Sequence, residues 1–365
     1  MIDPRDLPEL PALMIAGPGE LRDDDLKVLG HQVLAHYGET WTALHDETID
    51  AISLLLGANG GTYLVPGSGT TGVEMGIRNL FGPGQKVVVP NSGFFGARLM
   101  EIATALGLEV REVPVEVGEP VDVNLIAEAA VGADGVISVH VDTSTGVRHP
   151  IGEIAKAAHA AGGLFMVDAI ASAGGEVIDV EAMDIDLLVT GSQKGLEAPP
   201  GLAVVCLSNN GKQAIANRTF STLSWYLDIA VWDRFRTDWG AWHPHPVTMP
   251  TNIVIALASS VKRITEVGGG DWIEARAALA KHCREGLVEL GLSPVPVPGA
   301  EANLIVVAWA DDPDKILQAM EQGGIMIGGG LGPTAGKSIR IGLMGRNATE
   351  EMVDKALGII ANIVK

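Results

Sequence analysis

Short apolar runs alternate with helical patterns over the first half of the chain, from about Leu21 to Leu207. The helical pattern at 150–159, for example, leads directly into the apolar run 164–167. Because parallel strands need a crossover connection that is usually a helix, this alternation predicts repeated βαβ units. Strands covered by helices on both faces are apolar throughout, as these runs are. We therefore expect an α/β fold built around a mostly parallel sheet.

Two of the apolar runs end in a charged group. The run from Gly163 ends in Asp168, and the run from Ile185 leads to Lys194. The carboxyl ends of parallel strands meet at one edge of the sheet, so both side chains should reach one crevice. An Asp at such a point is also common as a helix cap, and a Lys beyond a strand is usually solvated. In one crevice, however, the pair suits a pyridoxal phosphate enzyme: the amine forms a Schiff base with the cofactor aldehyde, and the carboxylate keeps the pyridine nitrogen protonated.

The remainder of the chain divides at the end of this pattern. Only the turn 195–201 precedes the apolar run 202–207, which is too short for a crossover helix, so this run should pair antiparallel. We predict an N-terminal arm near the active site (1–20), a large cofactor-binding domain (21–251), and a linker helix with a smaller α+β domain (252–365). Within the last part, helices are expected at 252–267, 272–290 and 313–322, and strands at 303–309 and 338–342.

Composition excludes several classes of partner. The 365 residues include 25 Lys and Arg against 45 Asp and Glu, a formal charge of −20 that repels nucleic acids and anionic lipids. The start, Met1–Asp6, has neither a basic nor an apolar leader pattern, and no run approaches the roughly 18 apolar residues of a membrane span. A soluble cytoplasmic protein is expected. Cys206 and Cys283 lie far apart in apolar contexts, so we expect buried free thiols.

A glycine- and hydroxyl-rich loop could hold a phosphate. Residues 62–66 are predicted to form a strand, 67–70 a loop containing Ser68 and Thr70, and 71–80 a helix. Backbone N–H groups at a helix start, joined by hydroxyls, bind phosphate without any charged side chain. The same composition is also typical of ordinary turns.

Two further segments follow predicted strands. Phe95 comes after the strand 86–90 and could stack on pyridoxal or simply pack in the core. Thr143 comes after the strand 135–139 and could bond the phenolic oxygen of the cofactor, or belong to a hydroxyl-rich turn that caps a helix.

A segment rich in Trp and His follows the sheet. Trp225, Trp232 and Trp239 are seven residues apart, which predicts a buried helical stripe or a dimer contact. His243 and His245 lie between prolines, a pair that is more often structural than metal-binding. No metal site is predicted.

In this order and spacing, these segments resemble the class V aminotransferases of fold type I, most closely the alanine–glyoxylate and serine–glyoxylate group. The resemblance runs over nearly the whole chain, from Ala16-Gly17-Pro18-Gly19 to the segment 340–345. Its most specific parts are Gly-Ser-Gln-Lys at 191–194, Ala-Pro-Pro-Gly at 198–201 and Arg-Ile-Gly-Leu at 340–343. The resemblance implies the fold type I arrangement, with pyridoxal 5'-phosphate as cofactor.

The resemblance also implies a role for each matching residue. Lys194 would be the Schiff-base lysine and proton carrier, and Asp168 the partner of the pyridinium. Arg340 would clamp the substrate carboxylate, with Gly17 at the substrate pocket. The remaining implied contacts are with the cofactor: Phe95 as the stacking ring, Thr143 at the phenolic oxygen, Ser68, Gly69, Thr70 and Gln193 at the phosphate, and His245 and Thr248 reaching the phosphate from the other subunit of a homodimer.

The implied activity is a ping-pong transamination between alanine or serine and glyoxylate or pyruvate. His245, Phe95 and Asp142 stand where relatives often have Tyr, Trp and Glu, which leaves the amino donor open. Alternatives are a lyase like the cysteine desulfurases, an aminotransferase for a specialised amine, and a non-catalytic cofactor-binding subunit. Gln193 before the lysine argues against the first, since desulfurases and kynureninases have His-Lys there. The presence of both Lys194 and Asp168 argues against the last.

Overall fold

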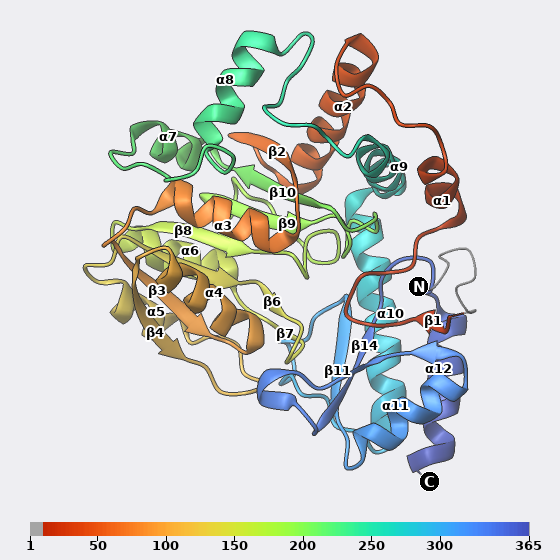
Figure 1. Cartoon of the computed structure of the whole chain (residues 1–365). Helices are drawn as coiled ribbons and strands as arrows, with labels where there is room; N and C mark the ends of the chain where they lie inside the picture. Colours follow the sequence, from red (N-terminus) through yellow and green to blue (C-terminus); the bar gives the residue numbers. More distant parts are fainter. Residues whose placement is uncertain (1–9, 365) are drawn as a thin grey trace, which may run out of the picture.

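The computed structural model describes residues 10–364 and has a seven-stranded sheet at its centre (Figure 1). The strand order is β2-β10-β9-β8-β5-β3-β4, and all neighbours are parallel except the two pairs made by β10. The α/β class and the antiparallel pairing of 202–207 are thus confirmed. The strands are β2 (Gly61–Pro66), β3 (Lys86–Asn91), β4 (Glu109–Pro114), β5 (Gly135–Val139), β8 (Leu164–Asp168), β9 (Leu187–Gly191) and β10 (Leu202–Leu207).

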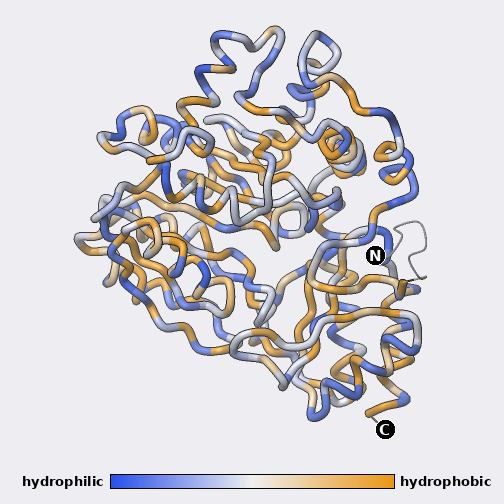
Figure 2. The backbone as a smooth tube through the Cα atoms, viewed as in Figure 1, coloured by the Kyte–Doolittle hydropathy of each residue, from blue (hydrophilic) through white to orange (hydrophobic). Residues whose placement is uncertain are grey.

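Helices pack on both faces of this sheet. Along β10, Leu202, Val204 and Cys206 belong to one apolar cluster, while the alternate side chains belong to the other. Hydrophobic residues accordingly run through the strands of the sheet (Figure 2). Burial on both faces explains why the inner strands read as mostly apolar runs, whereas the edge strand β4 is largely exposed and carries charged residues. One face carries α2 (Glu39–Leu56), α5 (Val123–Ala130), α6 (Ile151–Ala160) and α9 (Thr251–Val267); the other carries α3 (Gly69–Leu80), α4 (Phe94–Ala105), α7 (Asn209–Asn217) and α8 (Ile229–Trp239).

Residues 269–364 form the C-terminal unit. It contains a second, antiparallel sheet of order β11-β14-β13. The helix at 313–322 and the strand at 338–342 have the predicted bounds, whereas the strand predicted from 303 begins at Ile305. The boundaries proposed at 20/21 and 251/252 stay predictions. The elements are α10 (Gly269–Glu289), β11 (Ile305–Trp309), α11 (Pro313–Gln322), β12 (Ile325–Met326), β13 (Gly328–Gly329), a 3-10 turn (Gly332–Thr334), β14 (Ser338–Gly342) and α12 (Glu350–Val364).

The described part of the N-terminal arm connects the two sheets. Its strand β1 (Ala12–Leu13) pairs with β12 of the C-terminal unit, and Met14 O accepts a hydrogen bond from Gly342 N at 2.7 Å. Further along, Gly19 N donates to Gln193 O at 3.3 Å, beside Lys194, before α1 (Asp23–Leu29) begins. Residues 1–9, which include the start Met1–Asp6, lie outside the described residues.

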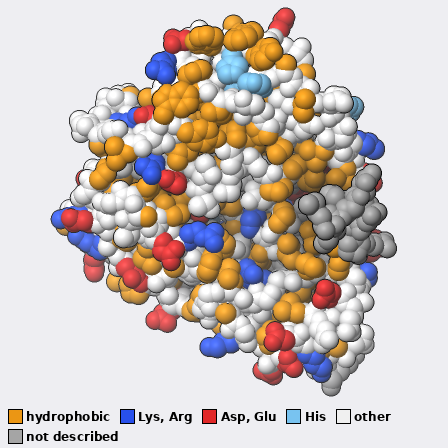
Figure 3. Space-filling model, viewed as in Figure 1, with side chains coloured by type: hydrophobic (Ala, Val, Ile, Leu, Met, Phe, Trp, Pro, Cys, Tyr) orange, Lys and Arg blue, Asp and Glu red, His pale blue; other side chains and the backbone are white. Residues whose placement is uncertain are grey.

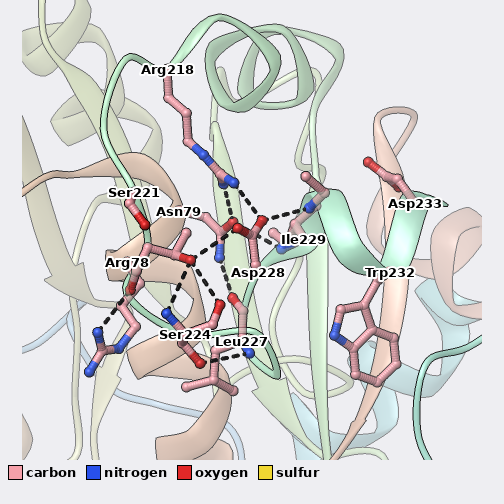
Figure 4. A network of polar contacts seen from close by, with 12 residues as sticks. Arg78, Asn79, Arg218, Ser221, Ser224, Leu227, Asp228, Ile229, Trp232 and Asp233 are labelled. Carbon is pink, nitrogen blue, oxygen red and sulfur yellow. Dashed lines mark hydrogen bonds and ion pairs between the residues drawn. The ribbon is translucent and has the colours of Figure 1, made fainter. Parts of the chain in front are cut away.

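A polar network attaches the Trp-rich segment to α3 (Figure 4). Asn79 Nδ2 donates to Leu227 O at 2.6 Å, and Asn79 Oδ1 accepts from Ile229 N at 3.0 Å. Asp228 caps α8 by accepting from Ala230 N at 2.9 Å and pairs with Arg218. The network fixes α8 relative to α3, whose first turn holds the predicted phosphate loop.

The prediction of a buried helical stripe of tryptophans is wrong. Trp232 is buried, but Trp225 is 55% and Trp239 53% exposed. The reason is that α8 begins only at Ile229, so Trp225 lies before the helix and the regular spacing does not define one helical face. The alternative, a dimer contact, stays a prediction.

Two expectations from composition can be compared with the structure. Cys206 and Cys283 are both buried free thiols, as predicted. Between residues 10 and 364, no helix has the length and apolar character needed to cross a bilayer.

Candidate active site

Lys194 and Asp168 line one cavity of about 180 Å³ at the carboxyl ends of β8 and β9. The cavity also brings together six more of the residues predicted for the cofactor, from four different segments of the chain. These are Ser68, Gly69, Thr70, Phe95, Thr143 and Gln193. Arg340, Gly17, His245 and Thr248 are not among its lining residues.

The Lys194 amine is buried and lies close to the N-terminal arm. Burial lowers the pKa of Lys194 to about 8; Asp168 opposes this shift, and the Arg340 and Arg98 charges add to it. The Nζ atom donates a hydrogen bond to Ala16 O. A Cβ on Gly17, which has φ +102°, would stand 2.5 Å from Lys194 Cδ, so only glycine fits there without movement. A lysine with a lowered pKa offers a neutral, nucleophilic amine close to physiological pH.

Asp168 ends β8 and lines the same cavity. Burial raises its pKa to about 6, while the hydrogen bond from Ile170 N (2.9 Å to Oδ1) and the Lys194 and Arg98 charges lower it. The carboxylate is therefore mainly ionised at neutral pH. An ionised, buried carboxylate can hold a proton on a heterocyclic nitrogen.

The predicted phosphate loop is the first turn of α3. The helix begins at Gly69, earlier than the predicted Thr71, with Ser68 as N-cap residue making no side-chain capping bond. Backbone N–H groups at a helix start attract anions. The Tyr226 hydroxyl donates to Pro66 O at 2.6 Å, at the end of β2 just before this turn, and so helps to hold the turn in position.

Asp142 orients two of the cavity segments, a role that the sequence did not suggest. Its Oδ2 accepts from Phe95 N at 2.9 Å and Gly96 N at 3.2 Å, and its Oδ1 accepts from Ser144 N and Oγ at 2.9 and 2.6 Å. One buried carboxylate thus ties the start of α4, with Phe95, to the loop that carries Thr143.

Arg98 is a second residue that sequence reasoning missed. It lines the cavity, and its guanidinium carbon lies 4.8 Å from the centre of the Phe95 ring. Its charge lowers the pKa of both Asp168 and Lys194. The available signal was helical spacing, because residue 98 shares a face of α4 with residue 95.

Arg340 does not line the cavity but is bonded to Thr143, which does. Its Nε donates to Gly329 O at 2.6 Å and its Nη1 to Thr143 O at 3.2 Å, which holds the guanidinium beside the Thr143 loop. Its charge is felt at Lys194, whose pKa it lowers. A planar guanidinium in this place is suited to a carboxylate on a substrate.

His245 points into the chain's own core. Its Nε2 accepts from Trp41 Nε1 at 2.8 Å, and its Nδ1 donates to Val247 O at 2.7 Å. Burial lowers the pKa of His245 to about 3, so the ring is neutral. A contact between His245 and another subunit's phosphate would first require one ring nitrogen to be released. Thr248 is exposed, and the inter-subunit role of both residues stays a prediction.

Ring nitrogens of His36, His243 and His245 lie within 4.8 Å of one another. His36 Nδ1 and His243 Nε2 are 3.2 Å apart, at hydrogen-bond distance. In the observed arrangement His245 has no lone pair available for a metal ion, because both of its nitrogens are bonded. The geometry thus favours the structural interpretation of the His243/His245 pair.

Comparison with known proteins identifies the family. The model for "Aminotransferase class-V" matches residues 24–355. The chain belongs to this family. Its members depend on pyridoxal phosphate, so this aminotransferase is an enzyme of the predicted class with the predicted cofactor and fold type.

Several relatives share nearly the whole length of this aminotransferase. An uncharacterized aminotransferase of Methanocaldococcus jannaschii is 31% identical over 93% of this chain and 89% of its own. The alanine–glyoxylate aminotransferase of Oryctolagus cuniculus is 31% identical over 94% and 90%. Among solved structures, an alanine–glyoxylate aminotransferase from Nostoc sp. superimposes with a TM-score of 0.93 at 27% identity, covering 100% of this chain and 98% of that one. The ureidoglycine–glyoxylate aminotransferase of Bacillus subtilis reaches 0.91 at 27% identity, over 98% and 94%.

The cavity fits pyridoxal phosphate on three observations. The α3 N-terminus and its hydroxyls suit the phosphate, the Phe95 ring suits the face of the pyridine, and the Asp168 carboxylate suits the ring nitrogen. When bound, the cofactor supplies an electron sink for a carbanion at the substrate Cα. Lys194 lines the same cavity, so its amine would be the group available to exchange protons with that carbon.

Proposed function

We propose that this aminotransferase transfers the amino group of a small amino acid, alanine or serine, to a small 2-oxo acid, glyoxylate or pyruvate. The observation that carries the proposal is the placement of Lys194, Asp168 and the α3 N-terminus in one cavity, with the Arg340 guanidinium bonded to Thr143 of the cavity lining. Alanine and glyoxylate are named in relatives that match over nearly their whole length.

Each residue has a definite task in this proposal. Lys194 would hold the cofactor through its amine and would carry the proton to and from the substrate Cα. Asp168 holds the proton on the ring nitrogen. Arg340 donates hydrogen bonds to the substrate carboxylate. Gly17 lies so close to Lys194 that no Cβ fits between them, and this close approach favours small substrates. The two half-reactions share one site, so the kinetics are ping-pong.

We further propose a homodimer with shared active sites. Four large aromatic side chains, the aromatic surface, are about half exposed: Tyr37, Trp225, Trp239 and Trp242. Trp242 contacts Tyr37 and Trp239 with ring centroids 5.2 and 5.9 Å apart. Histidine and hydrophobic side chains lie together at the end of the molecule where α2 and α8 are found (Figure 3). Exposed apolar patches of this kind mark interfaces, and Thr248 belongs to the neighbouring segment. A cytoplasmic location stays a prediction.

A specialised amine is the competing donor. Solved relatives include the ureidoglycine–glyoxylate enzyme and a pyridoxamine–pyruvate aminotransferase of Mesorhizobium loti, with a TM-score of 0.89 at 25% identity over 98% of this chain and 94% of that one. The deciding experiment assays purified enzyme with alanine, serine, ureidoglycine and pyridoxamine as donors and with glyoxylate and pyruvate as acceptors. Highest kcat/KM for alanine or serine supports the proposal. Highest kcat/KM for ureidoglycine or pyridoxamine refutes it.

A further inference from the structure

Glu197 is a buried carboxylate that lies just after Lys194 but outside the cavity. Its N–H donates to Lys194 O at 2.9 Å, which closes the turn after β9. Its φ of 52° lies in the region that favours glycine. A strained residue of this kind persists only where surrounding contacts hold it, and such positions cluster at functional sites.

Three separate segments bind the Glu197 carboxylate. Oε1 accepts from Arg276 Nη2 of α10 at 2.7 Å and from Gly345 N, just beyond β14, at 3.0 Å. Oε2 faces Arg22 Nε, at the end of the N-terminal arm, at 3.4 Å. Arg276 is itself buried and lies 4.3 Å from the centre of the Trp272 ring. Hydrogen bonds to a buried charged group are among the stronger ones in proteins.

Two of these segments continue into the residues that the proposed function assigns to the substrate. Gly345 continues β14, which carries Arg340, and Arg22 continues the arm, which carries Gly17 against Lys194. The arm and the C-terminal unit are also bonded to each other, since Arg346 N donates to Glu20 O at 3.0 Å. They therefore form one body, and Glu197 binds that body to the Lys194 turn.

We propose that Glu197 is a positioning residue for substrate recognition, which holds the Arg340 strand and the Gly17 arm in register with Lys194. The proposal rests on the proposed function, in which Arg340 and the arm meet the substrate. Glu197 does not contact the phosphate loop, Phe95 or Asp168, so it acts on substrate binding and leaves cofactor binding alone.

The test compares Glu197→Gln with Glu176→Gln. The glutamine at 197 keeps the size of the side chain and removes the charge that Arg22 and Arg276 share. Glu176 is a matched control: it is also buried and also joins the large sheet to the C-terminal unit, through Asn303 N at 2.7 Å and Asn303 Nδ2 at 3.0 Å. No bond links the Glu176 side chain to the Lys194 turn or to the part of the arm from residue 10 onward.

The expected result is a change in KM with little change in kcat. Displacing a binding group by a fraction of its own size weakens productive binding strongly, so KM of Glu197→Gln for the best donor should rise about ten- to a hundredfold. The Kd for pyridoxal phosphate should stay within about threefold of wild type, since the Glu197 carboxylate bonds to Arg22, Arg276 and Gly345 and not to the phosphate loop, Phe95 or Asp168. Glu176→Gln should keep the wild-type KM. A variant that is only less stable would instead lose active enzyme, lowering the apparent kcat at unchanged KM.

Hydrogen exchange measured by mass spectrometry gives a readout that needs no activity. In Glu197→Gln, exchange should become faster in 12–20 and 338–345 than in wild type, and in Glu176→Gln it should not. Should the wild type use none of the donors, the proposed function fails, and hydrogen exchange alone decides the positioning role. An unchanged KM, or unchanged exchange in both segments, overturns the proposal.

Discussion

Gly17 of the N-terminal arm lies directly against the aliphatic part of Lys194, and a Cβ at position 17 would stand 2.5 Å from Lys194 Cδ. The contact means that the arm forms one wall around the lysine that we propose carries the cofactor. It also explains a glycine with φ +102° at this point.

Gly17→Ala should displace either the arm or Lys194. Because small displacements of reacting groups lower rates steeply, we expect kcat/KM to fall about ten- to a hundredfold. Gly336→Ala is a useful control, since its φ is also positive but no atom lies within 4 Å of the added Cβ. Equal kinetic effects in the two variants would show that backbone strain, rather than contact with Lys194, is responsible.

Asp168→Asn should have opposite effects on the cofactor-free and cofactor-bound enzyme. Asp168 has a pKa of about 6 in the fold against an ordinary value of 3.8, so the folded state binds the proton more tightly than the unfolded state. Stability of the cofactor-free protein therefore falls as pH rises from about 4 to 6, and the accumulated loss of about 2–4 kcal/mol persists above that range. Asn carries no charge and avoids this loss.

Thermal unfolding of Asp168→Asn without cofactor should thus show a raised Tm at pH 7 and no gain near pH 4. With pyridoxal phosphate bound, the same variant should lose about a hundred- to ten-thousandfold in kcat, because the ring nitrogen no longer has its ionised partner. A lowered Tm at pH 7 without cofactor would contradict the burial argument.

Arg340→Ala should keep the cofactor and lose the substrate. The variant leaves the substrate carboxylate without its charged partner. The transition-state stabilisation that kcat/KM reports should therefore fall by about 2 to 5 kcal/mol, for alanine, serine and glyoxylate alike. The yellow colour of the bound cofactor should be retained. Wild-type efficiency in this variant, or loss of colour, would show that Arg340 is not the carboxylate clamp.

The aromatic surface should control assembly. A stable interface buries at least about 1,200 Å² and is usually anchored by aromatic side chains, so Trp239→Ser combined with Trp242→Ser should convert a dimer to monomers. Val177, 68% exposed but outside this surface, provides the control Val177→Ser. Sedimentation velocity measures the oligomeric state of the double variant and of the control. An active wild-type monomer at assay concentration would exclude the shared-site dimer.

Sequence reasoning reached the elements whose patterns are local. The strands that lead to Asp168 and Lys194 are buried on both faces and therefore read as mostly apolar runs, and position 68 lies at the helix start that its glycines and hydroxyls suggested. These signals depend on neighbours along the chain.

The residue roles that sequence reasoning missed depend on contacts between distant segments. Asp142 holds the start of α4 by bonds to Phe95 and Gly96, and Glu197 binds Arg22 and Arg276. Nothing in the local pattern separates these acids from solvated ones. The Trp spacing misled for a related reason, since a seven-residue period predicts a common face only inside one helix, and α8 begins after Trp225.

The most direct test of the account is to locate the lysine that carries the cofactor. Purified enzyme should be yellow, and borohydride reduction should attach the pyridoxyl group covalently to the attacking lysine. Peptide mass mapping should then find the label on the peptide that contains Lys194 and nowhere else, and Lys194→Ala should not be labelled. Label on a different lysine, or undiminished labelling of Lys194→Ala, would contradict the central assignment.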